Sequence, residues 1–169
     1  MVASVFALAI LPSSIEELQT HIEKNQAQVV LAASDFHTES SLRLPLDNFI
    51  ISQGYGIFHP GVDFAAPLGS PVHAVMAGTV ETVKHDRWGY GNHLYIDHGN
   101  GTKSLYAHLS QIKVKEGEMV TNETEIGLVG STGWSTGPHL HLQIWEEGKL
   151  VSPITFFENY FGRKLASIR

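Results

Sequence analysis

From Leu42 onward, turn-forming residues interrupt the chain at short intervals and leave little room for long helices. Turn signals, most of them containing glycine, recur about every 8–12 residues, the spacing typical of β-sandwiches and barrels. Between them lie short apolar and β-branched runs that suit strands. The expected strands cover residues 72–75, 78–83, 93–97, 103–107, 126–129 and 140–145. This pattern predicts an all-β sandwich or barrel.

The clearest hairpin signal is Asn100-Gly101. Both residues tolerate the positive φ angles of a type I′ turn, which connects antiparallel strands in the shortest way. We therefore expect residues 93–97 and 103–107 to be the two arms of one hairpin.

Residues 1–41 differ in character and are expected to form a leader before a domain of residues 42–169. An apolar run at 2–11 ends at Pro12 and contains Ala7-Leu8-Ala9, which has the form of a signal-peptide cleavage site, but no Lys or Arg precedes it. A truncated signal, a buried strand and a disordered start all remain open. A short helix is expected at 15–26 and a short strand at 29–33.

Composition excludes several functional classes. The 169 residues include 11 Lys and Arg against 17 Asp and Glu, for a net charge of −6. This balance argues against a nucleic-acid partner, because phosphate backbones need clustered basic residues. The absence of cysteine excludes disulfides, thiol catalysis and Cys-based zinc sites. No membrane-spanning segment is expected, because a span takes about 20 apolar residues.

Histidine is unusually frequent, and eight of the ten histidines lie between His59 and His141. In His59-Pro60-Gly61-Val62-Asp63, proline and glycine make a helix improbable, so we expect a turn at His59 that runs into a strand at Asp63. Such a turn can bring the imidazole and the carboxylate toward one point.

A second candidate set is His139-Leu140-His141, which follows a loop rich in Gly, Ser and Thr. In a strand, residues two apart face the same side, so both imidazoles project together while Leu140 packs on the other side. Two histidines and one carboxylate with an open position form a catalytic zinc arrangement suited to hydrolysis. The residues alone leave open whether His139, His141 or both bind the metal. His108, at the end of the expected hairpin, is a candidate base or oxyanion donor.

With these residues in view, the chain resembles the zinc metallopeptidases of the lysostaphin and LytM type, the M23 family of cell-wall endopeptidases. The resemblance covers roughly residues 45–157, in family order. The matching stretches are 58–67, 69–72, 77–80, 90–92, 105–110, 130–133 and 135–141.

The resemblance implies a mainly antiparallel β fold with a groove between loops. It assigns His59, Asp63 and His141 to Zn²⁺, and His108 and His139 to the catalytic layer. The implied function is hydrolysis of peptide bonds in peptidoglycan stem or cross-bridge peptides, at an extracytoplasmic location. Four aromatic residues are candidates to line the groove: Tyr55, Trp88, Tyr90 and Trp134.

Three other functions compete with this hypothesis. A non-catalytic module of the same fold could bind cell wall or activate a partner hydrolase, although the intact set of metal residues weighs against it. A biotinyl or lipoyl carrier barrel lacks its Met-Lys-Met hairpin tip here. A storage or structural zinc protein would need a closed site with four ligands.

Overall fold

The computed structural model describes residues 42–161, all within one compact unit. The expected leader of residues 1–41, with its helix at 15–26 and its strand at 29–33, lies outside the described residues. Over the described range, none of the helical structure has the length and apolar character needed to cross a bilayer.

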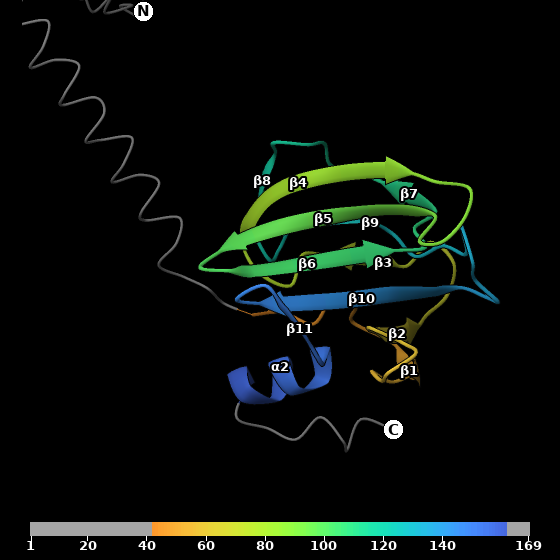
Figure 1. The fold of residues 1–169 in the computed structure, drawn as a ribbon. Coiled ribbons are helices and arrows are strands. Elements are labelled where there is room, and N and C mark those ends of the chain that lie inside the picture. Colours follow the sequence, from red (N-terminus) through yellow and green to blue (C-terminus); the bar gives the residue numbers. More distant parts are fainter. Residues whose placement is uncertain (1–41, 162–169) are drawn as a thin grey trace, which may run out of the picture. The chain divides into compact units, whose positions relative to one another are not determined.

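The main element is an eight-stranded sheet with the strand order β1-β2-β10-β6-β5-β4-β8, in which β11 also pairs with β10 (Figure 1). Every pairing in it is antiparallel. Its strands are β1 (Ile50–Gln53), β2 (Val62–Ala65), β4 (Gly78–His85), β5 (Asn92–Gly99), β6 (Thr102–Ala107), β8 (Met119–Val120), β10 (His139–Glu146) and β11 (Lys149–Val151).

A three-stranded sheet lies behind the larger one and is made of β3 (Pro71–His73), β9 (Glu125–Leu128) and β7 (Gln111–Ile112). The core contains the apolar residues that alternate along the strands, such as Phe64 of β2 and Leu140 and Leu142 of β10, none of which is exposed. The residues between them, including Asp63 and His141, therefore face the other side of the large sheet. The expected mainly β, antiparallel fold is confirmed.

The expected hairpin is also confirmed. β5 and β6 pair antiparallel from Leu94 opposite Tyr106 to Gly99 opposite Thr102. Asn100 and Gly101 at the turn have φ angles of 49° and 75°, the positive values that their sequence favours.

One short helix after Leu42 was not among the expected elements: α2 spans Pro153–Phe161 at the C-terminal end of the described residues. Two signals were present: Ser152 precedes the helix and bonds to the amide of Thr155 through its hydroxyl, and Pro153 occupies the first helical position. The helix packs against β10 and buries Phe156 and Phe157.

The remaining strands were not expected because little in their sequence marks them. β7 and β8 have two residues each and β11 has three. β1 is exposed along its whole length, so it shows no alternation of apolar and polar residues.

Candidate metal centre and active site

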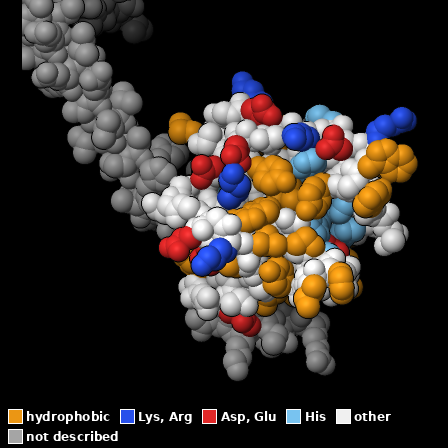
Figure 2. All heavy atoms as spheres, in the orientation of Figure 1, with side chains coloured by type: hydrophobic (Ala, Val, Ile, Leu, Met, Phe, Trp, Pro, Cys, Tyr) orange, Lys and Arg blue, Asp and Glu red, His pale blue; other side chains and the backbone are white. Residues whose placement is uncertain are grey.

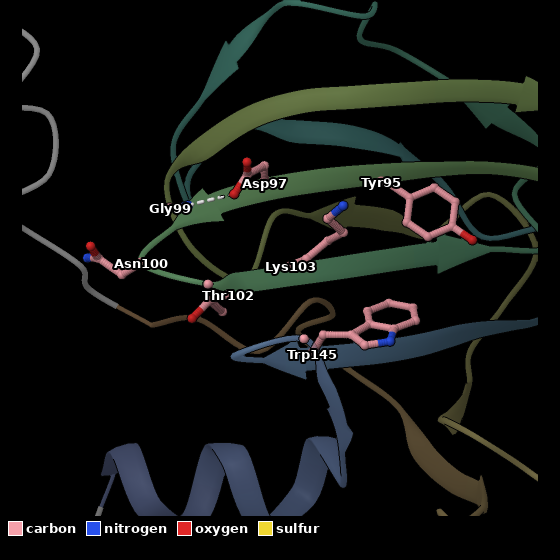
Figure 3. Close-up of a pocket in the computed structure, with 9 residues that line it drawn as sticks. Tyr95, Asp97, Gly99, Asn100, Thr102, Lys103 and Trp145 are labelled. Carbon is pink, nitrogen blue, oxygen red and sulfur yellow. Dashed lines mark hydrogen bonds between the residues drawn. The ribbon is translucent and has the colours of Figure 1, made fainter.

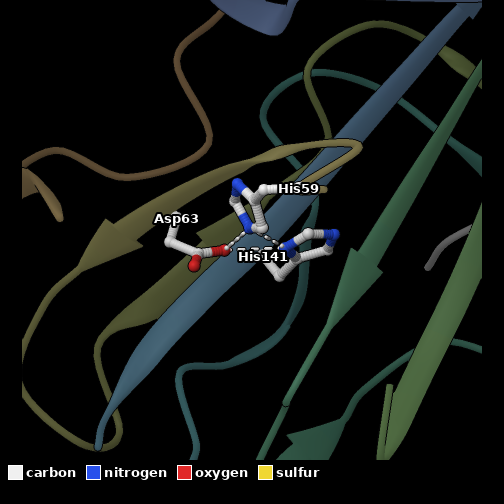
Figure 4. Close-up of side chains that lie close together, drawn as sticks. All are labelled: His59, Asp63 and His141. Carbon is white, nitrogen blue, oxygen red and sulfur yellow. Dashed lines mark hydrogen bonds and ion pairs between the residues drawn. The ribbon is translucent and has the colours of Figure 1, made fainter. Parts of the chain in front are cut away.

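Three side chains converge on one point (Figure 4). His59 lies in the turn between β1 and β2, Asp63 is in β2, and His141 is in β10. His59 Nε2 is 3.1 Å from Asp63 Oδ1 and 3.2 Å from His141 Nδ1, and His141 Nδ1 is 2.7 Å from Asp63 Oδ1. Each of the three side chains offers one potential metal-ligand atom, and these three atoms all lie within 4.8 Å of one another. Within residues 42–161, this is the group of His, Asp and Glu side chains that could hold a metal ion.

Strand pairing explains the convergence. β2 and β10 are neighbours, and their register places Asp63 directly opposite His141. A bridge between Gly56 and His59 closes the preceding turn and brings His59 back over the sheet. Gly61 is required in this turn because a Cβ there would lie 2.7 Å from Nε2 of His141.

The second nitrogen of each histidine in this group is also engaged. His59 donates Nδ1–H to the carbonyl of Gly54 at 2.8 Å, which leaves the Nε2 lone pair facing Asp63. The amide nitrogen of Gln143 lies 2.9 Å from Nε2 of His141 and 2.8 Å from the Tyr90 hydroxyl. Outer hydrogen bonds of this kind fix the tautomer and ring orientation of a metal-binding histidine.

His108 and His139 form a second pair beside these residues, with ring centroids 4.7 Å apart. His108 donates Nδ1–H to the carbonyl of Thr132 at 2.7 Å, and His139 donates Nδ1–H to that of Gly137 at 2.8 Å. Each keeps Nε2 available for proton transfer, and Nε2 of His139 is 3.8 Å from Asp63 Oδ1.

The backbone of His108 adopts φ of 61°, which is uncommon for a residue other than glycine. It follows the last residue of β6, and its amide donates to the carbonyl of Tyr90 at 2.9 Å. Strained backbone of this kind concentrates at functional sites, where surrounding contacts hold it in place.

Burial and nearby charges set the protonation of two groups. Burial raises the pKa of Asp63, but the hydrogen bond from His141 and the charges of His141, His59 and His139 outweigh it, so the net pKa is lowered. Burial lowers the pKa of His108 to about 4, against the opposing hydrogen bond to Thr132. At neutral pH, Asp63 is therefore a carboxylate and His108 a neutral imidazole.

All five residues line one cavity of about 410 Å³. Of the four aromatic residues expected at a groove, Tyr90 and Trp134 line this cavity, whereas Tyr55 and Trp88 are not among its lining residues. Trp134 is 74% exposed, so its ring is available to a ligand.

Sequence reasoning missed two residues near this centre. Gln143 is two residues beyond His141 on the same face of β10, and this spacing was the available signal. His93 is 4% exposed, and its ring contacts that of Tyr90 at a centroid distance of 5.6 Å. No feature of the sequence distinguished it from an ordinary core histidine.

Comparison with known proteins gives consistent matches. DD-carboxypeptidase/endopeptidase Mpg of Neisseria meningitidis serogroup B is 48% identical over 97 residues, which is 57% of this chain and 22% of that protein. Peptidoglycan DD-endopeptidase ShyA of Vibrio cholerae is 43% identical over 94 residues, which is 56% of this chain and 22% of that protein. The chain thus spans about a fifth of the length of these relatives.

A solved structure, described as a zinc containing peptidase from Vibrio cholerae, superposes with a TM-score of 0.63 and 34% sequence identity. The match covers 68% of this chain and 39% of that one. The model for peptidase family M23 matches residues 57–153, a range that holds all five histidine and aspartate residues of the cavity. With more than half of its length inside that model, the chain belongs to peptidase family M23.

Proposed function

We propose that this chain is a zinc-dependent endopeptidase that hydrolyses peptide bonds in peptidoglycan stem or cross-bridge peptides. The observation that carries the proposal is the convergence of His59 Nε2, Asp63 Oδ1 and His141 Nδ1 beside two further histidines. The peptidoglycan substrate is supported by the names of relatives such as ShyA. Because peptidoglycan lies outside the cytoplasmic membrane, the proposal includes an extracytoplasmic location.

The three proposed ligands fit zinc. Ligand atoms about 2.0–2.2 Å from a tetrahedral zinc ion lie about 3.3–3.6 Å from one another. Two of the three separations, 3.1 and 3.2 Å, come close to this range, and the third is shorter at 2.7 Å. The set consists of two imidazole nitrogens and one carboxylate oxygen, as in catalytic rather than closed structural sites.

Zinc held by these residues would lower the pKa of a bound water toward neutrality and polarise the carbonyl of the scissile bond. For His141 to offer Nδ1, its proton moves to Nε2, where a half-turn of the Gln143 amide presents Oε1 to accept it. Gln143 thereby holds the ligand tautomer.

His108 is the proposed base. Its Nδ1–H is held by Thr132, and its pKa of about 4 keeps Nε2 free to accept a proton from the attacking water. His139 has Nδ1–H held by Gly137 in the same way, so its Nε2 carries no proton at the start. Its ring lies 4.7 Å from that of His108, which places it to receive at Nε2 the proton that His108 took from water and to pass that proton to the leaving amine. Both imidazoles also provide donors to the oxyanion once they are protonated.

The direct test is digestion of purified cross-linked peptidoglycan, followed by mass spectrometry of the released fragments. The protein should release peptides with zinc, lose activity with a chelator and regain it on zinc addition. His141→Ala should lose bound zinc and activity together. Full activity without bound metal would refute the zinc assignment, and wall binding without hydrolysis in zinc-loaded protein would favour a non-catalytic module.

A further inference from the structure

A second cavity, of about 500 Å³, lies at the hairpin end of the large sheet (Figure 3). Its lining includes Tyr95, Asp97, Asn100, Thr102, Lys103 and Trp145. The rings of Tyr95 on β5 and Trp145 on β10 lie over the intervening strand β6, with centroids 6.1 Å apart. Cavities of this size, with aromatic walls and a few polar groups, are typical ligand sites.

This cavity shares a sheet face with the proposed active site. Trp145 and His141 are four residues apart on β10, so their side chains face the same side at a separation of about 13 Å along the strand. Figure 2 shows hydrophobic side chains gathered over this face, with histidines beside them. The face is therefore continuous from one cavity to the other.

A row of aromatic rings joins the two cavities. His141 stacks on Tyr90 at 5.7 Å, and Tyr90 contacts His93 at 5.6 Å. His93 contacts Tyr95 at 5.8 Å, and Tyr95 contacts Trp145 at 6.1 Å. His93 is buried and contacts the rings on either side of it, so a substrate lying along this row would pass from the proposed metal ligands to the second cavity over the half-buried rings of Tyr90, Tyr95 and Trp145.

The polar groups of the second cavity disfavour an anionic ligand and can accept hydrogen bonds from hydroxyls. Lys103 is paired with Glu81 at 2.7 Å, so its charge is compensated. Asp97 is an exposed carboxylate of the lining whose Oδ1 accepts from the Gly99 amide at 2.9 Å. Among residues 42–161, no hydrogen-bond partner is found for the Tyr95 hydroxyl, the Trp145 indole nitrogen or the Thr102 hydroxyl. Ring faces beside unpartnered neutral donors and acceptors match a sugar, which has an apolar face and hydroxyls at its edge.

We propose that this second cavity is a subsite for an amino-sugar ring of the peptidoglycan glycan strand. The proposal rests on the proposed function, because the glycan strand carries the peptides that would be cleaved. Extended peptide spans about 3.3–3.6 Å per residue, so about 13 Å corresponds to about four residues between the sugar and the scissile bond. The spacing of the two cavities thus suits a peptide still attached to its sugar.

Binding is tested first, without catalysis, by calorimetric titration of chelator-treated protein with peptide-free glycan strands whose lactyl carboxyl groups are capped as amides, so that the sugar remains uncharged. Thr102→Val removes one hydroxyl at constant shape and should weaken binding about two- to tenfold. Trp145→Leu should weaken it about tenfold or more. Thr155→Val on α2 is the matched control, because Thr155 is exposed and does not line the second cavity. Thermal unfolding of each variant verifies folding.

Hydrolysis is tested second, with cross-linked peptides that carry their sugars and the same peptides stripped of them. Wild-type protein should show the higher kcat/KM on the glycosylated form, and Thr102→Val should reduce that ratio. Absence of glycan binding, or binding unchanged in both cavity variants, overturns the subsite. If the two cavity variants bind the stripped peptide more weakly but bind glycan as wild type does, the sugar subsite is overturned and the cavity is a peptide site. Glycan binding sensitive to Thr102→Val but without hydrolysis supports the subsite and contradicts the proposed function instead.

Discussion

Asp63 and His141 face each other across neighbouring antiparallel strands, and Oδ1 of the first lies 2.7 Å from Nδ1 of the second. Both residues are therefore positioned by the pairing of strands β2 and β10 and not by a loop. Sites built on strands hold their geometry more tightly than sites built on loops. The large sheet therefore holds the two side chains in place as candidate metal ligands.

Asp63→Asn should weaken zinc binding by about 100-fold or more while preserving the fold. Asparagine keeps the size and an oxygen acceptor, but it removes the negative charge that strengthens the attraction between an oxygen ligand and a divalent cation. Competition titration with a chromogenic chelator measures the change, and thermal unfolding in chelator provides the control for stability. Unchanged zinc affinity would exclude Asp63 as a ligand.

His108→Asn should separate proton transfer from metal binding. Asparagine tolerates the positive φ of 61° at this position better than most residues, so the backbone should persist while the imidazole is lost. We expect kcat to fall about 10²–10⁴-fold, the usual contribution of a general base. Zinc content, measured by mass spectrometry, should stay at the wild-type value. Loss of zinc from this variant would instead place His108 among the metal ligands.

Gln143→Leu should reduce zinc affinity by about 10–100-fold, the effect typical of removing an outer hydrogen bond to a ligand. The leucine fills similar space but leaves Nε2 of His141 without its partner at 2.9 Å. Gln143→Glu is the matched rescue, because a carboxylate accepts the Nε2–H proton that the ligand tautomer carries. Equal affinities in wild type and both variants would contradict the positioning role.

The period of two along strands is enough to locate much of this site from the amino-acid sequence. It places His139 and His141 on one face with Leu140 in the core. Pro60-Gly61 correctly excludes a helix before Asp63, since this pair links the turn closed by Gly56 and His59 to strand β2. Sequence could not give the register that sets Asp63 opposite His141, because register depends on contacts between residues 78 positions apart. For the same reason the cavity between Tyr95 and Trp145, which needs three strands in register, had no local signal.

Gly61→Ala should damage both stability and metal binding. Its Cβ would lie 2.6 Å from the carbonyl oxygen of Leu142 and 2.7 Å from the His141 ring, so one of them must shift. We expect a loss of about 1–3 kcal/mol in the free energy of unfolding, as for other overpacked sites. Gly56→Ala is the control, because no atom lies within 4 Å of a Cβ there. Urea unfolding and zinc titration should separate the two variants, and equal behaviour would contradict the close approach.

His98 should make the fold sensitive to acid independently of the proposed metal ligands. The residue is 4% exposed, with Nδ1 bonded to the carbonyl of Ala77 at 2.9 Å and Nε2 to the Ser104 hydroxyl at 2.7 Å. Burial lowers its pKa from the ordinary value of 6.5, against the opposing hydrogen bond to Ala77. The neutral form is therefore favoured in the folded state.

The pKa of His98 is lower in the folded protein than in the unfolded chain. Its contribution to the free energy of unfolding is therefore fully present above pH 6.5. It is lost as the pH falls below that value, because the unfolded chain takes up a proton that the folded protein excludes. The loss is at most about 1.4 kcal/mol per pH unit and stops below the folded-state pKa. The double variant His98→Leu/Ser104→Ala removes the titrating group together with the Ser104 hydroxyl. The carbonyl of Ala77 loses its donor at every pH, so the comparison uses the change in stability between two pH values and not the absolute stability. Urea unfolding in chelator at about pH 7.5 and about pH 5 should show a smaller loss in this variant than in wild type. Identical losses in the two proteins would show that His98 does not carry the acid sensitivity.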